Sequence, residues 1–249
     1  MLKITPIPAF QDNYIWMIQN GNHVAIVDPG DAAPVVSVLQ KENLTLDAIL
    51  ITHHHNDHIG GVQSLLKAYP TKIFAPANES FDFPHQPVHE NDLIQLPNLR
   101  LNLSVLDIPG HTIGHVAYYG LNHLFCGDTL FGGGCGRLFE GTYEQLFNSL
   151  QKLAALPDET LVYCAHEYTE HNLRFASLVD SKNPALINRI TLTKKVRASN
   201  TPSLPSSIGL EKETNPFLRC DDQTIASALG LQAPDTITVF KTLRNMRNN

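Results

Sequence analysis

The sequence predicts an α+β protein in two parts: a first part that mixes strands with helices, and a small all-α second part. Short apolar runs typical of strands alternate with helical stretches up to about residue 170. Beyond that point the pattern is helical, with no convincing strand. The charge changes at the same place, since residues 1–170 hold 7 Lys+Arg and 18 Asp+Glu, whereas residues 171–249 hold 11 and 6. We therefore expect one domain over residues 1–168 and a second over residues 169–249.

The first part is expected to begin with a β-hairpin. Apolar runs at residues 14–18 and 23–27 flank Asn20-Gly21, a strong hairpin signal because both residues tolerate positive φ. Asp28-Pro29-Gly30 ends the second run, and residues 32–41 have the periodicity of a helix.

A buried strand and further elements follow. Residues 48–51 form a continuous apolar run, as expected of a strand buried on both faces, and residues 60–68 are expected to be helical. Thr142-Tyr143-Glu144-Gln145 fits a capping box that opens another helix. The remaining strands of this part are expected at residues 72–75, 93–96, 101–108, 116–119, 123–126 and 160–164.

The second part is expected to be built of four helices. A Pro/Ser-rich connector at residues 201–207 separates the first two from the last two. The helices are expected at roughly residues 171–180, 184–198, 221–230 and 235–247.

Composition narrows the classes of protein to consider. With 249 residues, 43% hydrophobic and 17% charged, the chain can bury a sizeable core. No apolar run is long enough to cross a bilayer, and the N-terminus lacks a secretory signal, so we expect a cytoplasmic protein with no membrane partner. The four cysteines form no CxxC pair, which agrees with reduced thiols. A net charge of −6 argues against a nucleic-acid partner, and we expect a monomer.

A histidine-rich segment, His53-His54-His55-Asn56-Asp57-His58, directly follows the buried strand at residues 48–51. Residues two apart in an extended segment point to the same side, so His53 and His55 can converge on one ion. Asp57 and His58 lie further along the turn, where a second ion could bind. Imidazole and carboxylate suit divalent metals such as Zn²⁺. The alternatives are a purification tag, which its internal position disfavours, and a hydrogen-bonded polar turn.

Three more potential ligands follow apolar runs elsewhere in the first part. His111, Asp128 and His166 each stand just beyond the end of an expected strand, where loops collect the chemistry of a layered fold. Each alone is a weak signal, because such residues often serve as turn or structural residues. Together with the histidine-rich segment they predict a metal centre.

The spacing His53-x-His55-x-Asp57-His58 resembles the HxHxDH motif of the metallo-β-lactamase-fold hydrolases. Further segments resemble one family of that group, glyoxalase II or the hydroxyacylglutathione hydrolases. The resemblance covers essentially the whole chain. The segments that carry it are residues 10–16, 27–30, 127–131, 133–137, 165–169 and 215–219.

The resemblance implies a four-layer αββα sandwich over residues 1–168 as the catalytic domain, with residues 169–249 as a helical substrate-binding cap. It also implies two divalent ions, with Zn²⁺ first and Fe or Mn as alternatives. Asp128 would bridge the ions, and a hydroxide held between them would be the nucleophile. The two sets of remaining ligands would be His53, His55 and His111 for the first ion, and Asp57, His58 and His166 for the second.

The implied reaction is hydrolysis of S-D-lactoylglutathione, or of related 2-hydroxyacyl-glutathione thioesters, in methylglyoxal detoxification. A thiolate can depart without a strong general acid, because free thiols have a pKa near ~8.5. Arg244 and Arg247 are three apart on the last expected helix and could grip a glutathione carboxylate, although a solvated basic helix end would look the same. The resemblance gives substrate-binding roles to Arg137, Phe139, Tyr168, Arg244 and Arg247.

Other functions fit the same motif less well. A persulfide dioxygenase of this fold would use one iron, which the full set of seven ligands disfavours. A secreted β-lactamase is disfavoured by the lack of an export signal, and a nuclease by the acidic first part. A non-catalytic metal-binding protein would normally have lost some of the seven ligands.

Overall fold

The computed structural model describes residues 2–248, which form two compact units. Unit 1 comprises the chain up to Asp107 together with Thr112–Gly127, and unit 2 comprises Ile108–His111 together with the chain from Asp128 onward. This division by packing differs from the expected boundary between residues 168 and 169. That boundary separates a catalytic domain from a cap by function and stays a prediction.

Unit 1 contains a mixed six-stranded sheet in sequential order, in which β1 to β3 are antiparallel and β3 to β6 parallel. Its strands are β1 (Lys3–Ala9), β2 (Asn13–Asn20), β3 (His23–Val27), β4 (Thr45–Leu50), β5 (Lys72–Pro76) and β6 (Gln86–Val88). The expected hairpin is confirmed, with Gly21 at φ 62° in the turn between β2 and β3. Strand β1 escaped the sequence analysis because Pro6 and Pro8 interrupt its pattern, which an edge strand tolerates.

A second, antiparallel group of strands in unit 1 packs against the first sheet. It consists of β7 (Leu93–Leu96), β8 (Leu101–Asp107), β9 (Val116–Gly120) and β10 (His123–Gly127), with the 3-10 turn η1 (Pro97–Leu99) between β7 and β8. The hydroxyl of buried Tyr118 on β9 donates to the carbonyl oxygen of Ile51, 2.6 Å away, and so joins the two layers.

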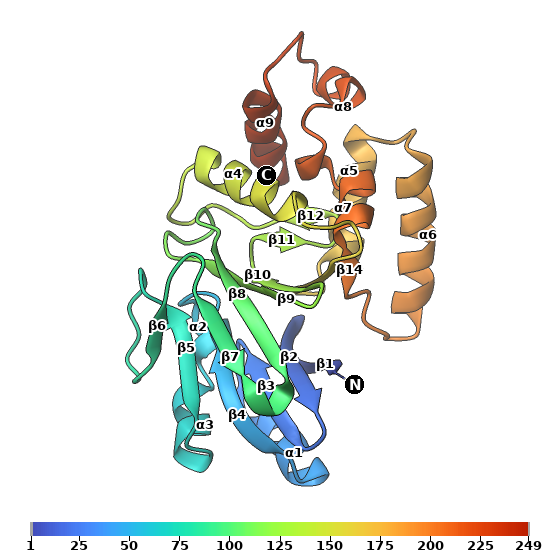
Figure 1. Cartoon of the computed structure of the whole chain (residues 1–249). Coiled ribbons are helices and arrows are strands. Elements are labelled where there is room, and N and C mark those ends of the chain that lie inside the picture. The colour runs from blue at the N-terminus through green and yellow to red at the C-terminus, as the bar shows by residue number, and fades with distance from the viewer. Residues whose placement is uncertain (1, 249) are drawn as a thin grey trace. The chain divides into compact units, whose positions relative to one another are not determined.

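Helices α1 (Ala32–Glu42) and α3 (Val62–Ala68) cover the other face of the six-stranded sheet (Figure 1). Val35 and Leu39 of α1 and Leu65 of α3 pack with Ile49 of β4 in one buried cluster. The short helix α2 (Asn56–Ile59) begins within the histidine-rich segment. Unit 1 is therefore layered as helices, sheet and sheet.

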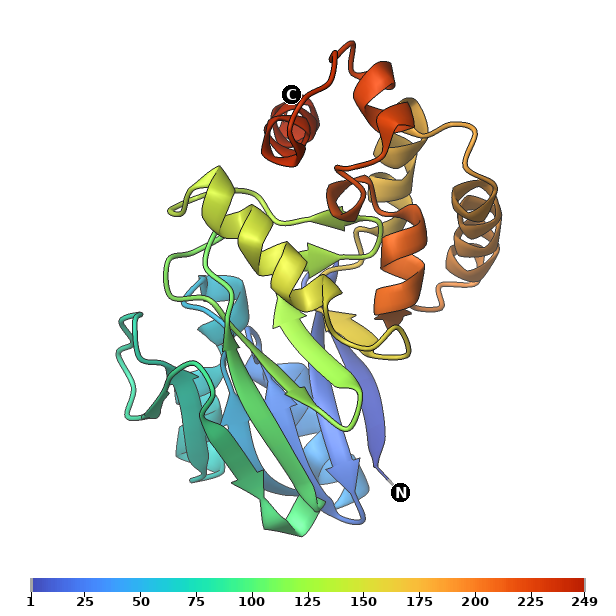
Figure 2. The same ribbon diagram turned by 45° about the horizontal axis from the view of Figure 1, so that its top comes forward.

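Unit 2 is mainly helical (Figure 2). Its helices are α4 (Tyr143–Ala154), α5 (Thr169–Val179), α6 (Pro184–Ala198), α7 (Ile208–Thr214), α8 (Gln223–Ala228) and α9 (Thr236–Asn248), with the 3-10 turn η2 (Pro216–Leu218). Helix α6 lies beside α5 and α7, and α9 beside α4. Two antiparallel pairs of short strands complete it: β11 (Leu130–Phe131) with β12 (Gly134–Cys135), and β13 (Leu161–Cys164) with β14 (Ser206–Ser207).

The four helices expected after residue 170 are confirmed as α5, α6, α8 and α9, and so is the capping box at Thr142 and Gln145. Helix α7, directly after the connector, was not predicted. The expectation of no strand in this part was wrong, because β14 ends the Pro/Ser-rich connector. A strand of two serines has no apolar pattern to reveal it. No helix within residues 2–248 has the length and apolar character needed to span a membrane.

Candidate metal centre

In unit 1, the ring nitrogens of the histidine-rich segment come close together just beyond β4. His53 is fully buried, and its Nε2 lies 3.1 Å from Nδ1 of His55. His58 Nε2 lies 3.5 Å from Oδ2 of Asp57. Ligand atoms about 2.0–2.1 Å from a tetrahedral zinc ion are roughly 3.3 Å from one another. The spacing of these donor atoms therefore suits ligands that share an ion.

Buried Asp28 holds this segment from the end of β3. Its carboxylate accepts from the Thr52 main-chain N–H (2.7 Å), from the Thr52 hydroxyl (2.6 Å) and from His58 Nδ1 (3.0 Å). Asp28 lies close enough to His53 and His58 to be a ligand itself. Because both of its oxygens already accept these bonds, we assign it to orienting His58, whose proton on Nδ1 leaves Nε2 available for a metal.

Asp28 lies in the family-like segment at residues 27–30, but no role was predicted for it. The signal that pointed to His111, Asp128 and His166 also applies to it, because Asp28 directly follows an apolar strand.

Asp57 is oriented by Asn13, which lies in the family-like segment at residues 10–16. The buried amide of Asn13 donates through Nδ2 to Asp57 Oδ2 over 3.0 Å. One carboxylate oxygen of Asp57 is thereby fixed, and with it the direction of the other.

Gly30 and Gly127, each in a family-like segment, allow the main chain to come very close to the histidine-rich segment. A Cβ atom on Gly30 would lie 1.8 Å from the carbonyl oxygen of Asp57. At Gly127, where φ is +48°, it would lie 2.4 Å from Thr52 Oγ1. Any side chain at either position would displace the histidine-rich segment.

His54 points to a different partner from its neighbours. Its Nδ1 lies 3.1 Å from Oε2 of Glu79, which also accepts a hydrogen bond from the Thr112 hydroxyl. Burial raises the pKa of the Glu79 carboxyl. Glu79 was not predicted, because it lies in a loop with no motif. The ring of buried His115 stacks on the His53 ring, with 4.5 Å between the ring centres.

Unit 2 carries the other three potential ligands. Oδ2 of Asp128 lies 3.5 Å from His111 Nε2 and 3.3 Å from His166 Nε2. His111 Nδ1 is 2.9 Å from the carbonyl oxygen of Arg137, so the proton sits on Nδ1 and Nε2 is available as a ligand atom. One carboxylate thus stands between two buried imidazoles.

Aromatic side chains flank these histidines within unit 2. The Tyr168 ring stacks on the His166 ring, with 4.7 Å between the ring centres and 5° between the ring planes. Phe139 is 63% exposed, and its ring is nearly perpendicular to the His111 ring, with 5.2 Å between the ring centres.

The two arginines of α9 have different surroundings. Arg244 is only 2% exposed, and its Nη1 donates to the carbonyl oxygens of Cys135 (2.9 Å) and Gly136 (3.2 Å). Arg247 is half-buried and donates to Asn172 Oδ1 over 3.2 Å. Arg244 therefore binds the glycine-rich loop formed by residues 133–137.

Arg247 belongs to a cluster of positive charge in unit 2. Partial burial, followed by the charges of Arg244 and Arg137, lowers the pKa of the Arg247 guanidinium. Burial, and then the charges of Arg247, Arg174 and Arg137, lower the pKa of His171. This concentration of positive charge suits an anionic ligand.

The glycine-rich loop is also held from helix α7. The fully buried carboxylate of Glu211 accepts from the Gly133 N–H at 2.8 Å, from Asn215 Nδ2 at 3.0 Å and from Arg189. Asn215 Nδ2 also donates to the Gly134 carbonyl oxygen. These bonds give a structural role to Asn215, which lies in the family-like segment at residues 215–219. Glu211 was not predicted, because it lies in no such segment.

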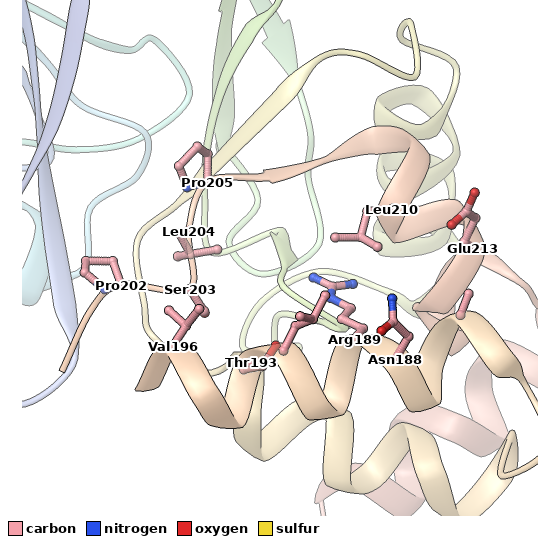
Figure 3. A pocket seen from close by; sticks show the side chains of 12 residues that line it. Asn188, Arg189, Thr193, Val196, Pro202, Ser203, Leu204, Pro205, Leu210 and Glu213 are labelled. Carbon is pink, nitrogen blue, oxygen red and sulfur yellow. The ribbon is translucent and has the colours of Figure 1, made fainter. Parts of the chain in front are cut away.

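A cavity of about 320 Å³ in unit 2 lies between α6, the connector and α7 (Figure 3). Arg189 is part of its wall and is bonded to buried Glu211. None of the residues predicted to bind metal or substrate lines it.

The potential ligands are thus four residues of unit 1 and three of unit 2, all imidazoles and carboxylates. This donor set and the fold indicate binding of a divalent metal.

Comparisons with known proteins cover the whole chain. Residues 10–166 match the model of the metallo-beta-lactamase superfamily, and residues 167–249 match that of the hydroxyacylglutathione hydrolase C-terminus. The chain is 55% identical over 249 residues to a hydroxyacylglutathione hydrolase from Methylobacillus flagellatus, with 100% of both chains covered.

Two solved structures share the fold. One is ETHE1 from Myxococcus xanthus, with a TM-score of 0.67 and 24% identity over 99% of this chain and 98% of that chain. The other is TTHA1623 in a di-iron-bound form, with a TM-score of 0.61 and 26% identity over 87% of this chain and 100% of that chain. The fold and the resemblance predicted from the motifs are confirmed: the chain belongs to the hydroxyacylglutathione hydrolase, or glyoxalase II, family within the metallo-β-lactamase superfamily.

Proposed function

We propose that this protein hydrolyses S-D-lactoylglutathione and related 2-hydroxyacyl-glutathione thioesters to the hydroxy acid and glutathione. The proposal places it in the cytoplasm, as a monomer, in methylglyoxal detoxification. The observation that carries it is the 55% identity over the full length to a hydroxyacylglutathione hydrolase. That match favours thioester hydrolysis over a persulfide dioxygenase or another hydrolase of this fold.

The proposed metal centre holds two divalent ions, Zn²⁺ first, with Fe or Mn as alternatives. When bound, such ions act as Lewis acids and lower the pKa of a water molecule to near neutrality. The proposed ligands are His53, His55 and His111 for one ion, Asp57, His58 and His166 for the other, and Asp128 shared between them. The protons held on Nδ1 of His58 and His111 support this assignment, because each leaves Nε2 as the ligand atom.

The chain's own residues hold the centre and the substrate. Asp28 orients His58, and Asn13 fixes one oxygen of Asp57. The glutathione thiolate departs without an acid residue, because a thiolate whose conjugate thiol has a pKa near ~8.5 is already a good leaving group. The buried Cys135 is not proposed as a nucleophile, since burial raises the pKa of its thiol.

For the glutathione carboxylates we propose Arg137 and Arg247 as the direct partners, with Tyr168 and Phe139 beside the peptide. The charge cluster of unit 2 supports this role. Arg244 was expected to share it, but its burial and its bonds to the loop carbonyls support an indirect one: it positions the loop that carries Arg137.

The test combines a metal assay with a thioesterase assay on the same purified protein. We expect cleavage of S-D-lactoylglutathione at neutral pH, loss of cleavage after chelation, and recovery on adding Zn²⁺. Protein that is fully loaded with two metals but leaves the thioester intact would overturn the proposal. Oxygen consumption with glutathione persulfide, in place of thioester cleavage, would identify the dioxygenase alternative.

A further inference from the structure

Phe10 is an exposed aromatic side chain in an unfavourable backbone conformation. It follows β1, is 60% exposed, and has φ at 51°. A bulky residue rarely adopts this left-handed region, and a large apolar ring gains nothing from contact with water. Strained residues of this kind tend to lie at functional sites.

The surroundings of Phe10 link it to the proposed metal ligand Asp57. A Cβ atom on Gly30 would lie 3.0 Å from Phe10 Cε2 and 1.8 Å from the carbonyl oxygen of Asp57, so the ring edge and the Asp57 main chain lie side by side. Three residues after Phe10, Asn13 donates to the Asp57 carboxylate. The segment from Phe10 to Asn13 is therefore bonded to Asp57 through Asn13, and it places the Phe10 ring next to the Asp57 main chain.

The carboxylate of Asp57 is itself partly open to solvent, with 43% of its side chain exposed. A substrate whose reacting carbonyl comes to Asp57 would bring its acyl substituent close to an apolar ring. Burying that ring against an apolar substituent would remove both from water, which is favourable.

We propose that Phe10 is a specificity-determining residue, whose ring packs against the acyl group of the thioester and favours 2-hydroxyacyl groups with an apolar substituent. This inference rests on the proposed function. It concerns the acyl side of the substrate, whereas the arginines of unit 2 concern the peptide side.

A binding experiment tests the contact without catalysis. The protein has one tryptophan, Trp16, which is 2% exposed, so Phe10→Trp adds an exposed reporter. We expect its emission to shift to the blue with S-benzylglutathione, a thioether that cannot be hydrolysed, and not with glutathione. Leu121→Trp is the matched control, because Leu121 is also exposed (65%) at positive φ, in the turn after β9. Equal shifts in both variants, or none in Phe10→Trp, would overturn the inference.

A kinetic experiment tests the specificity. Phe10→Gly removes the ring while relieving the strain at φ 51°, and Leu121→Gly is again the control. We expect Phe10→Gly to lower kcat/KM for S-mandeloylglutathione about tenfold more than for S-D-lactoylglutathione, as loss of an apolar contact does. Equal losses for both thioesters would mean a structural role and overturn the inference alone. A wild-type protein that cleaves neither thioester would overturn the proposed function, and this inference with it.

Discussion

Replacing Arg244 by Met removes a buried cation while keeping most of the side-chain volume. In the native protein the guanidinium of Arg244 lies 5.2 Å from the ring centre of Phe217 and donates to Cys135, Gly136 and, through Nη2, to Asn248. After the substitution the two loop carbonyl oxygens lose a charged donor inside the protein. We expect the variant to be less stable and its glycine-rich loop to be less well ordered.

The size of the loss follows from these contacts. Hydrogen bonds from charged groups contribute roughly 1.5–3 kcal/mol each, so two carbonyl bonds amount to about 3–6 kcal/mol. Arg244 Nε is buried with no hydrogen bond within the described residues, so part of the cost of burying the cation is recovered on substitution. We expect the free energy of unfolding to fall by about 2–4 kcal/mol.

Urea denaturation followed by circular dichroism measures this loss. Arg247→Met is the matched control. Half-buried Arg247 makes a single bond, to Asn172, and because solvent weakens a partly exposed charged bond, its loss should cost about 1 kcal/mol or less. In thioesterase assays, Arg247→Met should raise KM with little change in kcat. If Arg244→Met instead destabilised no more than a surface substitution, about 0.5 kcal/mol, and raised KM alone, the loop-positioning role would be refuted.

Four further predictions concern the metal centre and the thiols. Asp28→Ala leaves two buried donors of Thr52 and one of His58 without their acceptor. The free energy of unfolding in urea should therefore fall by about 3 kcal/mol or more, and the amount of bound metal should also fall. A variant that is equally stable and fully loaded with metal would contradict the role of Asp28. EDTA should lower the apparent Tm in scanning fluorimetry, because a metal that binds the native state stabilises it, and an unchanged Tm would count against a resident metal. Burial raises the pKa of the Cys135 and Cys220 thiols, so the unfolded state ionises first, and stability should fall as pH rises above about 8.5. At pH 8 a thiol reagent should accordingly label none of the four buried cysteines before denaturation and all four after it; rapid labelling of the native protein would contradict this.

Much of the fold could be predicted from local pattern. The hairpin at Asn20-Gly21, the capping box at Thr142 and the helices α5, α6, α8 and α9 of the second part each depend on residues close in sequence. Elements without a periodic pattern were missed. Strand β1 carries two prolines, and β14 consists of two serines whose pairing depends on β13, more than 40 residues earlier.

The residues of the candidate site likewise fall into those that could be predicted from the sequence and those that could not. The sequence by itself determined the potential ligands, because an HxHxDH segment and the residues that follow strands are local features. It could not distinguish Arg244 from Arg247, since two arginines three apart on a helix look alike until the packing of that helix is known.

Only the tertiary structure decided which residues hold the site in place. Asp28 meets His58 across 30 residues, Glu211 meets Gly133 across 78, and Arg244 meets Cys135 across 109. Each of these bonds joins a buried charged side chain to a partner that is distant along the chain. Sequence periodicity reports which side of an element is apolar, whereas the partner of a buried charge is set by how separate elements pack.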